Sequence, residues 1–255
     1  LWYIGVKKVK DNNGSDLIFD IEISGRKFSI LPWKINVGTV PLYLLDTNIP
    51  QNDDQIRRVT DHLYVSDREL RILQEIILAY GSIKLMEILN IKPTIYHLNE
   101  GHSAFLIIKR LEDMIKNEGF TFDEATELIR ISTVFTTHTP VPAGNEKFPM
   151  ELVKTYMKDK ITSLGMSFEQ FSELAKVKDD ESFFMPALAI RFASFINGVS
   201  KLHSAVSKQM WHSIYPDLYE DEMPIDSITN GVHLQSWLSR QLTRLFDRYI
   251  GPDYT

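Results

Sequence analysis

The segment YHLNEGHSAF, residues 96–105, places two histidines, an asparagine and a glutamate between an apolar strand and an apolar helix. The strand is predicted at residues 94–98, just after Pro93, and is short and rich in β-branched and aromatic residues. The helix is predicted because apolar residues recur three or four positions apart. These residues are Ala104, Ile107, Ile108, Leu111 and Ile115. A strand that leads through a polar turn into a helix is half of a β–α–β unit.

Strands and helices alternate through the rest of the chain. The predicted elements are a strand at residues 130–138, a charged helical region at roughly 150–178, a long helix from about Pro186, a strand at 224–232, and a closing helix at 236–246 with Ser236 as its N-cap. This alternation is typical of β–α–β units and a parallel sheet. We therefore expect an α/β fold whose parallel sheet has flanking helices.

The first 46 residues have a different pattern. Residues 17–30 alternate apolar and polar side chains on either side of a Ser-Gly turn, which predicts a hairpin. Residues 33–46 predict one or two further strands that end at Asp46, and residues 47–58 predict a polar loop. We expect a β-rich part at residues 1–46 and a helical and β–α–β part at residues 47–255.

A helix is predicted at residues 66–89, where the apolar period changes from two to about 3.6. Ser66 and Glu69 match a capping box at its start. One face of this helix is predicted to be apolar. It consists of Leu70, Leu73, Ile76, Ile77 and Tyr80.

Composition limits the class of protein. The net charge of -6 and the pI near 5.7 argue against a nucleic-acid or anionic-membrane partner. No apolar run is long enough to span a bilayer, and no signal peptide opens the sequence. The chain has no cysteine, which excludes disulfides and thiolate metal sites and suits the cytoplasm. It starts without methionine and reads as a piece of a longer protein.

Three polar clusters lie at the carboxyl ends of predicted strands. They are Asn99, Glu100 and His102; Thr137, His138 and Thr139; and Asn230 with His233. Ligands of open parallel sheets bind at this edge. Helix capping is the alternative explanation for any single cluster, and Asn99 is a candidate N-cap. Three clusters on one edge favour a binding site.

The residue types indicate which ligand this site suits. His97, Glu100 and His102 do not have the spacing of a zinc site, so we expect no metal. The chain has no Gly-x-Gly pair for a nucleotide and no Gly-x-Ser-x-Gly elbow for a serine hydrolase. Neutral donors and acceptors with one carboxylate suit a polyhydroxylated ligand. The residues alone therefore favour a carbohydrate-handling α/β domain.

Four segments of the chain, in this order, resemble one protein family. They are HLNEGHSAF at residues 97–105, FTTHTPVPAGNEKF at 135–148, INGVSKLHSAVSKQMW at 196–211 and SITNGVHLQSWL at 227–238. The segment LYVSDRELRILQE at residues 63–75 is similar to a stretch ahead of the first motif. Together they resemble the α-glucan (glycogen and maltodextrin) phosphorylases, in the shorter bacterial and archaeal form.

The resemblance implies an activity and an architecture. This family cleaves α-1,4-glucan with inorganic phosphate and releases glucose 1-phosphate with retention of configuration. It uses pyridoxal phosphate, whose phosphate group donates a proton. The fold is that of a GT-B glycosyltransferase, with two Rossmann-like domains across a cleft. The chain resembles an incomplete amino-terminal glucan-binding domain. The cofactor lysine belongs to the carboxy-terminal domain, so we expect this chain alone to be inactive.

The resemblance also implies roles for individual residues. His138 matches the histidine that contacts the glucosyl unit beside the reaction centre, and it is the candidate catalytic residue. Asn230 matches the asparagine that hydrogen-bonds the glucose 6-hydroxyl. Val199 matches an apolar wall against the same edge of the sugar.

Further matched residues lie around the sugar site. Glu100 and His102 match acidic and histidine positions in a pocket beside it. Thr139 is a further candidate for substrate binding. Residues 141–145 match a mobile loop that flanks the cleft.

Two other functions stay open. One is a different GT-B glycosyltransferase, such as a glycogen synthase-like protein. The other is a non-catalytic carbohydrate-binding domain. A homo-oligomer is possible, and the resemblance does not imply regulation by phosphorylation or nucleotides.

Overall fold

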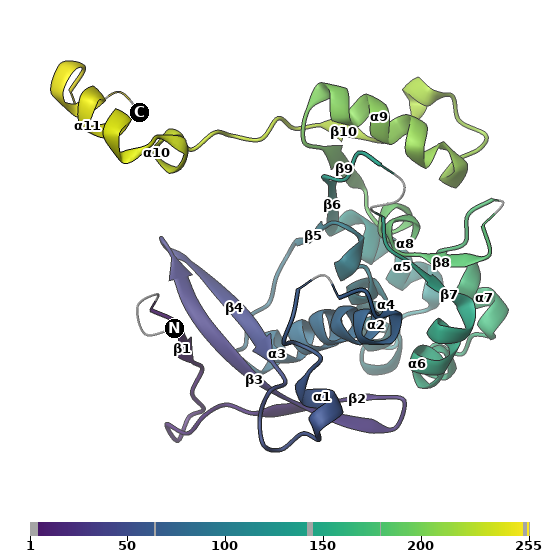
Figure 1. Ribbon diagram of the computed structural model, residues 1–255. Helices are drawn as coiled ribbons and strands as arrows, with labels where there is room; N and C mark the ends of the chain where they lie inside the picture. The colour runs from purple at the N-terminus through teal and green to yellow at the C-terminus, as the bar shows by residue number, and fades with distance from the viewer. Residues whose placement is uncertain (1–4, 64, 142–144, 179, 252–253, 255) are drawn as a thin grey trace.

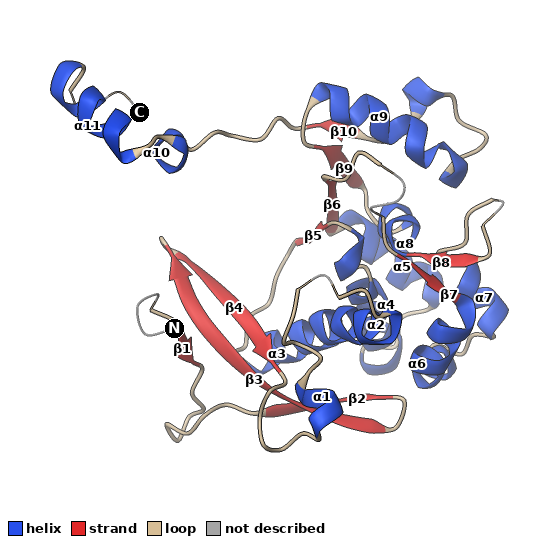
Figure 2. Ribbon diagram, in the orientation of Figure 1, coloured by secondary structure: helices blue, strands red, loops and turns tan. Residues whose placement is uncertain are grey.

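The computed structural model describes residues 5–63, 65–141, 145–178, 180–251 and 254 (Figure 1). The chain is a mixed α/β protein in which a parallel sheet and an antiparallel sheet pack with helices (Figure 2). Within the described residues, every helix is too short or too polar to cross a bilayer.

The parallel sheet confirms the α/β prediction. Its strand order is β10–β9–β6–β5, and each neighbouring pair is parallel. The strands are β5 (Tyr96–Asn99), β6 (Thr133–Thr137), β9 (Phe195–Gly198) and β10 (Asp226–Ser227). The crossover from β5 to β6 consists of the 3-10 turn η3 (Gly101–Ser103), α4 (Phe105–Asn117) and α5 (Phe122–Ile131). Parallel neighbours require such crossovers, so the helices cover the sheet.

The prediction of one long helix from about Pro186 is wrong. Helix α8 (Met185–Arg191) has only seven residues, and the chain then forms β9 before α9 (Lys201–Trp211). The residues from Met185 to Ile190 are all buried, and so are the last three residues of β9. An apolar run that is buried on every side has no period that separates a helix from a strand.

Two of the predicted strands, at residues 130–138 and 224–232, are shorter in the structure. Residues 130 and 131 complete the last turn of α5, and Ser132 caps it by donating its hydroxyl to the Leu128 carbonyl at 2.6 Å. The strand predicted at residues 224–232 is paired only at Asp226 and Ser227.

The charged helical region predicted at roughly 150–178 contains two helices, α6 (Met150–Ser163) and α7 (Phe168–Glu173). They are flanked by a two-stranded sheet of β7 (Lys147–Pro149) and β8 (Ser182–Phe184). Four buried phenylalanines join this sheet to α4 and α7 by stacking. They are Phe105, Phe148, Phe171 and Phe183, with ring centroids 5.4 to 6.4 Å apart.

The antiparallel sheet is built on the long strand β3 (Arg26–Val37). Its first half pairs with β2 (Phe19–Ile23), and its second half pairs with β1 (Lys7–Lys8) and β4 (Val40–Asp46). The short helix α1 (Asp54–Arg57) lies within the predicted polar loop.

A continuous helix lies between the antiparallel sheet and α4 (Figure 1). It consists of α2 (Arg68–Ile76), a π-helical turn η2 (Ile77–Gly81) and α3 (Ser82–Ile88). The predicted apolar face is buried at Leu73, Ile76, Ile77 and Tyr80 and half-buried at Leu70.

The capping box predicted at Ser66 and Glu69 is wrong. Asp67 is the N-cap of α2, and its carboxylate accepts the backbone N–H groups of Glu69 and Leu70 at 2.9 Å each. Asp is as good an N-cap as Ser, and the helix therefore begins one residue later than the capping box predicts.

The carboxy-terminal helices stand apart from the rest of the chain (Figure 1). The 3-10 turns η5 (His212–Ile214) and η6 (Glu220–Glu222) precede β10, and α10 (Leu234–Trp237) and α11 (Arg240–Tyr249) follow it. Ser239, not the predicted Ser236, caps α11, because its hydroxyl accepts the Leu242 N–H at 3.3 Å. No described residue after Ile225 is buried.

Replacing the N-cap of α2 tests this assignment. We expect Asp67→Ala to lower the free energy of unfolding by about 1 kcal/mol, since it leaves two backbone donors without their acceptor. Ser66→Ala is the matched control and should change it by less than about 0.5 kcal/mol. Urea unfolding followed by circular dichroism measures both. Equal losses in the two variants would contradict the assignment.

Candidate functional site

Glu100 occupies a strained turn at the carboxyl end of β5. Its backbone has φ 66° and ψ 172°, a region that is almost restricted to glycine and costs about 1–3 kcal/mol for other residues. Its N–H donates to the Thr136 carbonyl at 2.9 Å, which extends the β5–β6 pairing by one residue. The next residue, Gly101, packs against Pro186, where a Cβ atom would lie 2.9 Å from the proline Cδ. The turn is therefore restricted by the hydrogen bond to β6 on one side and by the contact with Pro186 on the other.

The Glu100 carboxylate joins the ends of two strands. The side chain is buried, and its Oε1 accepts the backbone N–H of His138 and the hydroxyl of Thr139, the latter at 3.1 Å. Hydrogen bonds to a charged acceptor contribute about 1.5–3 kcal/mol each. Two such bonds outweigh the backbone strain, so the carboxylate accounts for the strained turn.

Five residues of the predicted polar clusters line one cavity of about 410 Å³ at this sheet edge. The complete lining is Val65, Arg71, Asn99, Glu100, His102, His138, Thr139 and Glu146. The His138 side chain is 40% exposed, and its Nδ1 lies 3.7 Å from Glu100 Oε1. The structure thus brings Glu100, His102, His138 and Thr139 together from two strand ends.

Arg71 and Glu146 belong to this cavity, and the sequence analysis missed both. Arg71 reaches from α2, and its Nε lies 2.8 Å from Glu146 Oε2 and 3.2 Å from Glu75 Oε1. Arg68 adds a second ion pair to Glu146 at 2.5 Å. Arg71 lies in the similar segment at residues 63–75 and Glu146 in the motif at residues 135–148, but a contact between residues 75 positions apart has no local pattern.

Two ionisable groups here have shifted pKa values. Burial raises the pKa of the Glu75 carboxyl well above its ordinary value, against the opposing effect of Arg71. Burial, assisted by the Arg71 charge, lowers the pKa of His102. The cavity wall therefore carries a neutral imidazole at neutral pH.

Val199 and Asn230 lie at the same sheet edge but do not line this cavity. The Asn230 N–H donates to the Val199 carbonyl at 3.3 Å, which joins the segments after β9 and β10. Thr137 pairs with Gly198, so His138 and Val199 are the next residues on adjacent strands. Val199 is half-buried and Asn230 is exposed, and both side chains are accessible at the edge.

His97 and His233 have environments separate from the cavity. The Thr136 hydroxyl donates to Asn197 Oδ1 at 2.9 Å, so His97 Nε2 donates to that hydroxyl at 2.7 Å. His97 therefore does not join Glu100 and His102. Among the described residues, His233 forms its one side-chain hydrogen bond with the neighbouring Ser236 hydroxyl, at 2.7 Å. Across the described residues, no three His, Asp or Glu side chains are arranged to hold a metal ion.

Comparison with known proteins identifies the family. The sequence model of the carbohydrate phosphorylase family matches residues 47–255. The chain belongs to the carbohydrate phosphorylase family. It is similar to a maltodextrin phosphorylase of Thermococcus litoralis, with 41% identity over 96% of this chain and 29% of that protein.

Glycogen phosphorylases are also similar to this phosphorylase chain. That of Mycobacterium tuberculosis is 36% identical over 97% of the chain and 30% of its own length. That of Aquifex aeolicus is 34% identical over 98% of the chain and 36% of its own length. The chain spans about a third of the length of these relatives.

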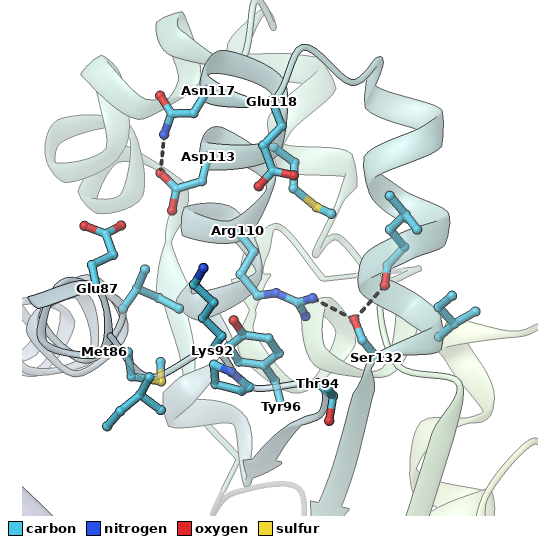
Figure 3. Close-up of a pocket in the computed structure, with 16 residues that line it drawn as sticks. Met86, Glu87, Lys92, Thr94, Tyr96, Arg110, Asp113, Asn117, Glu118 and Ser132 are labelled. Carbon is cyan, nitrogen blue, oxygen red and sulfur yellow. Dashed lines mark hydrogen bonds between the residues drawn. The ribbon is translucent and has the colours of Figure 1, made fainter. Parts of the chain in front are cut away.

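A second cavity of this phosphorylase chain, of about 560 Å³, lies near the amino end of β5, between α3, α4 and α5 (Figure 3). Arg110 stacks on Tyr96 there at 3.9 Å and donates to the hydroxyls of Ser132 and Thr133. Those hydroxyls in turn donate to the last carbonyls of α5. The cation thus compensates the negative end of a helix. This structural role accounts for Arg110.

Residues 142–144 lie outside the described part of the chain, and they make up most of the loop predicted at residues 141–145. The described ends differ in accessibility. Val141 is exposed, whereas Asn145 is buried and donates its amide to the Val141 carbonyl at 3.1 Å.

The contact of Gly101 with Pro186 predicts a large effect of a small substitution. We expect Gly101→Ala to lower the free energy of unfolding by about 1–3 kcal/mol, because the added methyl group meets Pro186 at less than van der Waals distance. Gly231→Ala is the matched control, since a Cβ there meets nothing within 4 Å. Thermal unfolding of both variants gives the comparison. A neutral Gly101→Ala would show that the turn has room to relax.

Proposed function

We propose that this chain is the glucan-binding part of an α-glucan phosphorylase, which cleaves α-1,4-glucan with inorganic phosphate to release glucose 1-phosphate. One observation supports this most directly. The buried Glu100 holds the backbone of His138 at the carboxyl edge of a parallel sheet and leaves its imidazole exposed to a cavity. Ligands of such sheets bind at this edge, and the chain is similar to maltodextrin and glycogen phosphorylases.

The proposed roles are those that the resemblance to the α-glucan phosphorylases implies. His138 contacts the glucosyl unit beside the reacting bond, and Asn230 hydrogen-bonds its hydroxymethyl group. Val199 forms an apolar wall against the same edge of the sugar. Cleavage with retention passes through a flattened, cation-like sugar ring. Contacts that tighten as this ring forms lower the barrier rather than only the dissociation constant.

Glu100, His102 and Thr139 are proposed to support the sugar site from the neighbouring cavity. The Thr139 hydroxyl proton is donated to Glu100, which leaves the oxygen lone pairs as acceptors for a sugar hydroxyl. Glu100 already accepts two hydrogen bonds, so its main contribution is to position His138.

The residues around the cavity do not fit pyridoxal phosphate. This cofactor binds a lysine amine as a Schiff base, and none of the described residues that line the cavity is a lysine. Following the resemblance, which assigns the cofactor lysine to the carboxy-terminal domain, we propose that the cofactor binds that domain and not this cavity. The chain alone is proposed to lack phosphorylase activity.

The proposed function also implies a domain organisation, a set of partners and a cellular location. The chain supplies one Rossmann-like half of a GT-B glycosyltransferase, with residues 1–46 and 47–255 as its two parts. The acidic charge favours neither nucleic acid nor an anionic membrane as partner, and the lack of cysteine suits the cytoplasm. A homo-oligomer is compatible with the proposal.

Kinetics of two substitutions in the complete phosphorylase polypeptide test the assigned roles. We expect His138→Ala and Asn230→Ala each to reduce kcat roughly 5- to 150-fold, because losing a hydrogen bond in a closed site costs about 1–3 kcal/mol. Release of glucose 1-phosphate from maltodextrin and phosphate is the measurement.

His233→Ala is the matched control, because this histidine lies near Asn230 in the sequence but forms its one side-chain hydrogen bond, among the described residues, with Ser236. It should keep wild-type kcat. An increase in KM with unchanged kcat for both test variants would show uniform binding only. Glucosyl transfer from a nucleotide sugar, without phosphorolysis, would favour the synthase-like alternative. Binding of glucan without either reaction would favour a carbohydrate-binding domain.

A further inference from the structure

Arg71 and His102 make a contact that determines which ring nitrogen of His102 carries the proton. The Nη2 of Arg71 lies 3.3 Å from His102 Nδ1. A guanidinium group has five N–H donors and no acceptor. His102 Nδ1 must therefore accept this hydrogen bond, which places the proton of the neutral ring on Nε2.

We propose that Arg71 is a positioning residue that holds His102 as the neutral Nε2–H tautomer, so that His102 presents a hydrogen-bond donor to an oxygen atom in the 410 Å³ cavity. Nε2 has no hydrogen-bond partner among the described residues, and the ring lines the cavity beside His138. The proposal rests on the proposed function only for the identity of the oxygen, which would belong to a sugar hydroxyl or a phosphate.

Arg71 is itself held in place. Its side chain is 10% exposed, and its Nε lies between Glu75 on its own helix and Glu146 just before β7. Glu75 is 1% exposed, and its carboxyl oxygens accept no hydrogen bond from the described residues. The hydrogen bond from Nε to Glu146 Oε2, at 2.8 Å, and the buried position of the side chain restrict the rotation of the planar guanidinium, so Nη2 stays directed at His102.

The charges around His102 come from three segments. Arg71 on α2 opposes protonation of the ring, and so does burial. Glu100 after β5 and Glu146 before β7 favour protonation. Burial and Arg71 prevail, and they lower the pKa of His102. Without Arg71, the two glutamates would act on the ring with no opposing cation.

The test is a direct measurement of the His102 tautomer in the 255-residue chain. The chain is labelled with ¹⁵N in histidine, and heteronuclear NMR follows both ring nitrogens of His102 as a function of pH. The signals are assigned by their loss in His102→Gln. In the wild type we expect protonation at Nε2 and not at Nδ1 at neutral pH, and a pKa below that of ordinary histidine.

Two arginine substitutions separate positioning from general electrostatics. Arg71→Gln should shift the His102 pKa upward and mix the two tautomers. Arg68→Gln is the matched control, because Arg68 pairs with Glu146 but makes no contact with His102. It should keep the wild-type tautomer. Arg71→Lys keeps a cationic donor and should retain most of the wild-type behaviour if Arg71→Gln does not fold.

The outcomes distinguish this inference from the proposed function. The role of Arg71 would be overturned by a proton on His102 Nδ1 in the wild type. It would also be overturned if Arg71→Gln kept the wild-type pKa and tautomer of His102, or if Arg71→Lys mixed the two tautomers. Maltodextrin and inorganic phosphate are then added separately to the wild-type chain. If the wild type has the expected tautomer, the ligand that shifts the NMR signal of His102 Nε2–H is the one that supplies the oxygen. No shift by either, in this chain and in the complete polypeptide, would contradict the glucan assignment and leave the tautomer result intact.

Discussion

The hydrogen bond from the His138 backbone to the buried Glu100 carboxylate is the interaction on which the candidate site depends. Parallel strands end side by side, but their pairing does not fix the chain that follows them. Glu100 supplies this link across the ends of β5 and β6, at the cost of a backbone conformation that suits glycine. Strain of this kind persists where the surrounding contacts require it, and it is common at functional sites.

The alternation of strands and helices was enough to predict the parallel sheet, and the polar residues at the strand ends favoured one edge as the candidate site. Strand β9 could not be predicted, because the preceding helix and the strand are both buried and have no polar period. The caps of α2 and α11 were each misplaced because Ser66 and Ser236 have better-placed neighbours in Asp67 and Ser239. Local sequence identified the type of element more reliably than its first residue.

The contacts of Arg71 show what the sequence could not predict about the site. Arg71 reads as a polar position on an amphipathic helix, yet it joins Glu146 and His102, which follow it by 75 and 31 residues. Such a network arises only from tertiary packing. It also explains why a site of mainly neutral groups contains a buried arginine. The cation is matched by carboxylates on its own side of the cavity, and it acts on the site through an imidazole.

The segment that carries Asn230 is attached to the sheet by only a few backbone contacts. Strand β10 pairs through two residues, Ile228 and Asn230 each donate one further hydrogen bond, and no described residue beyond Ile225 is buried. Local opening of this segment therefore costs far less than global unfolding. Its amides should exchange with solvent through fraying alone. If Asn230 contacts a ligand as proposed, that contact would add to the few that hold this segment, and part of its effect would be to fix the segment at the sheet edge.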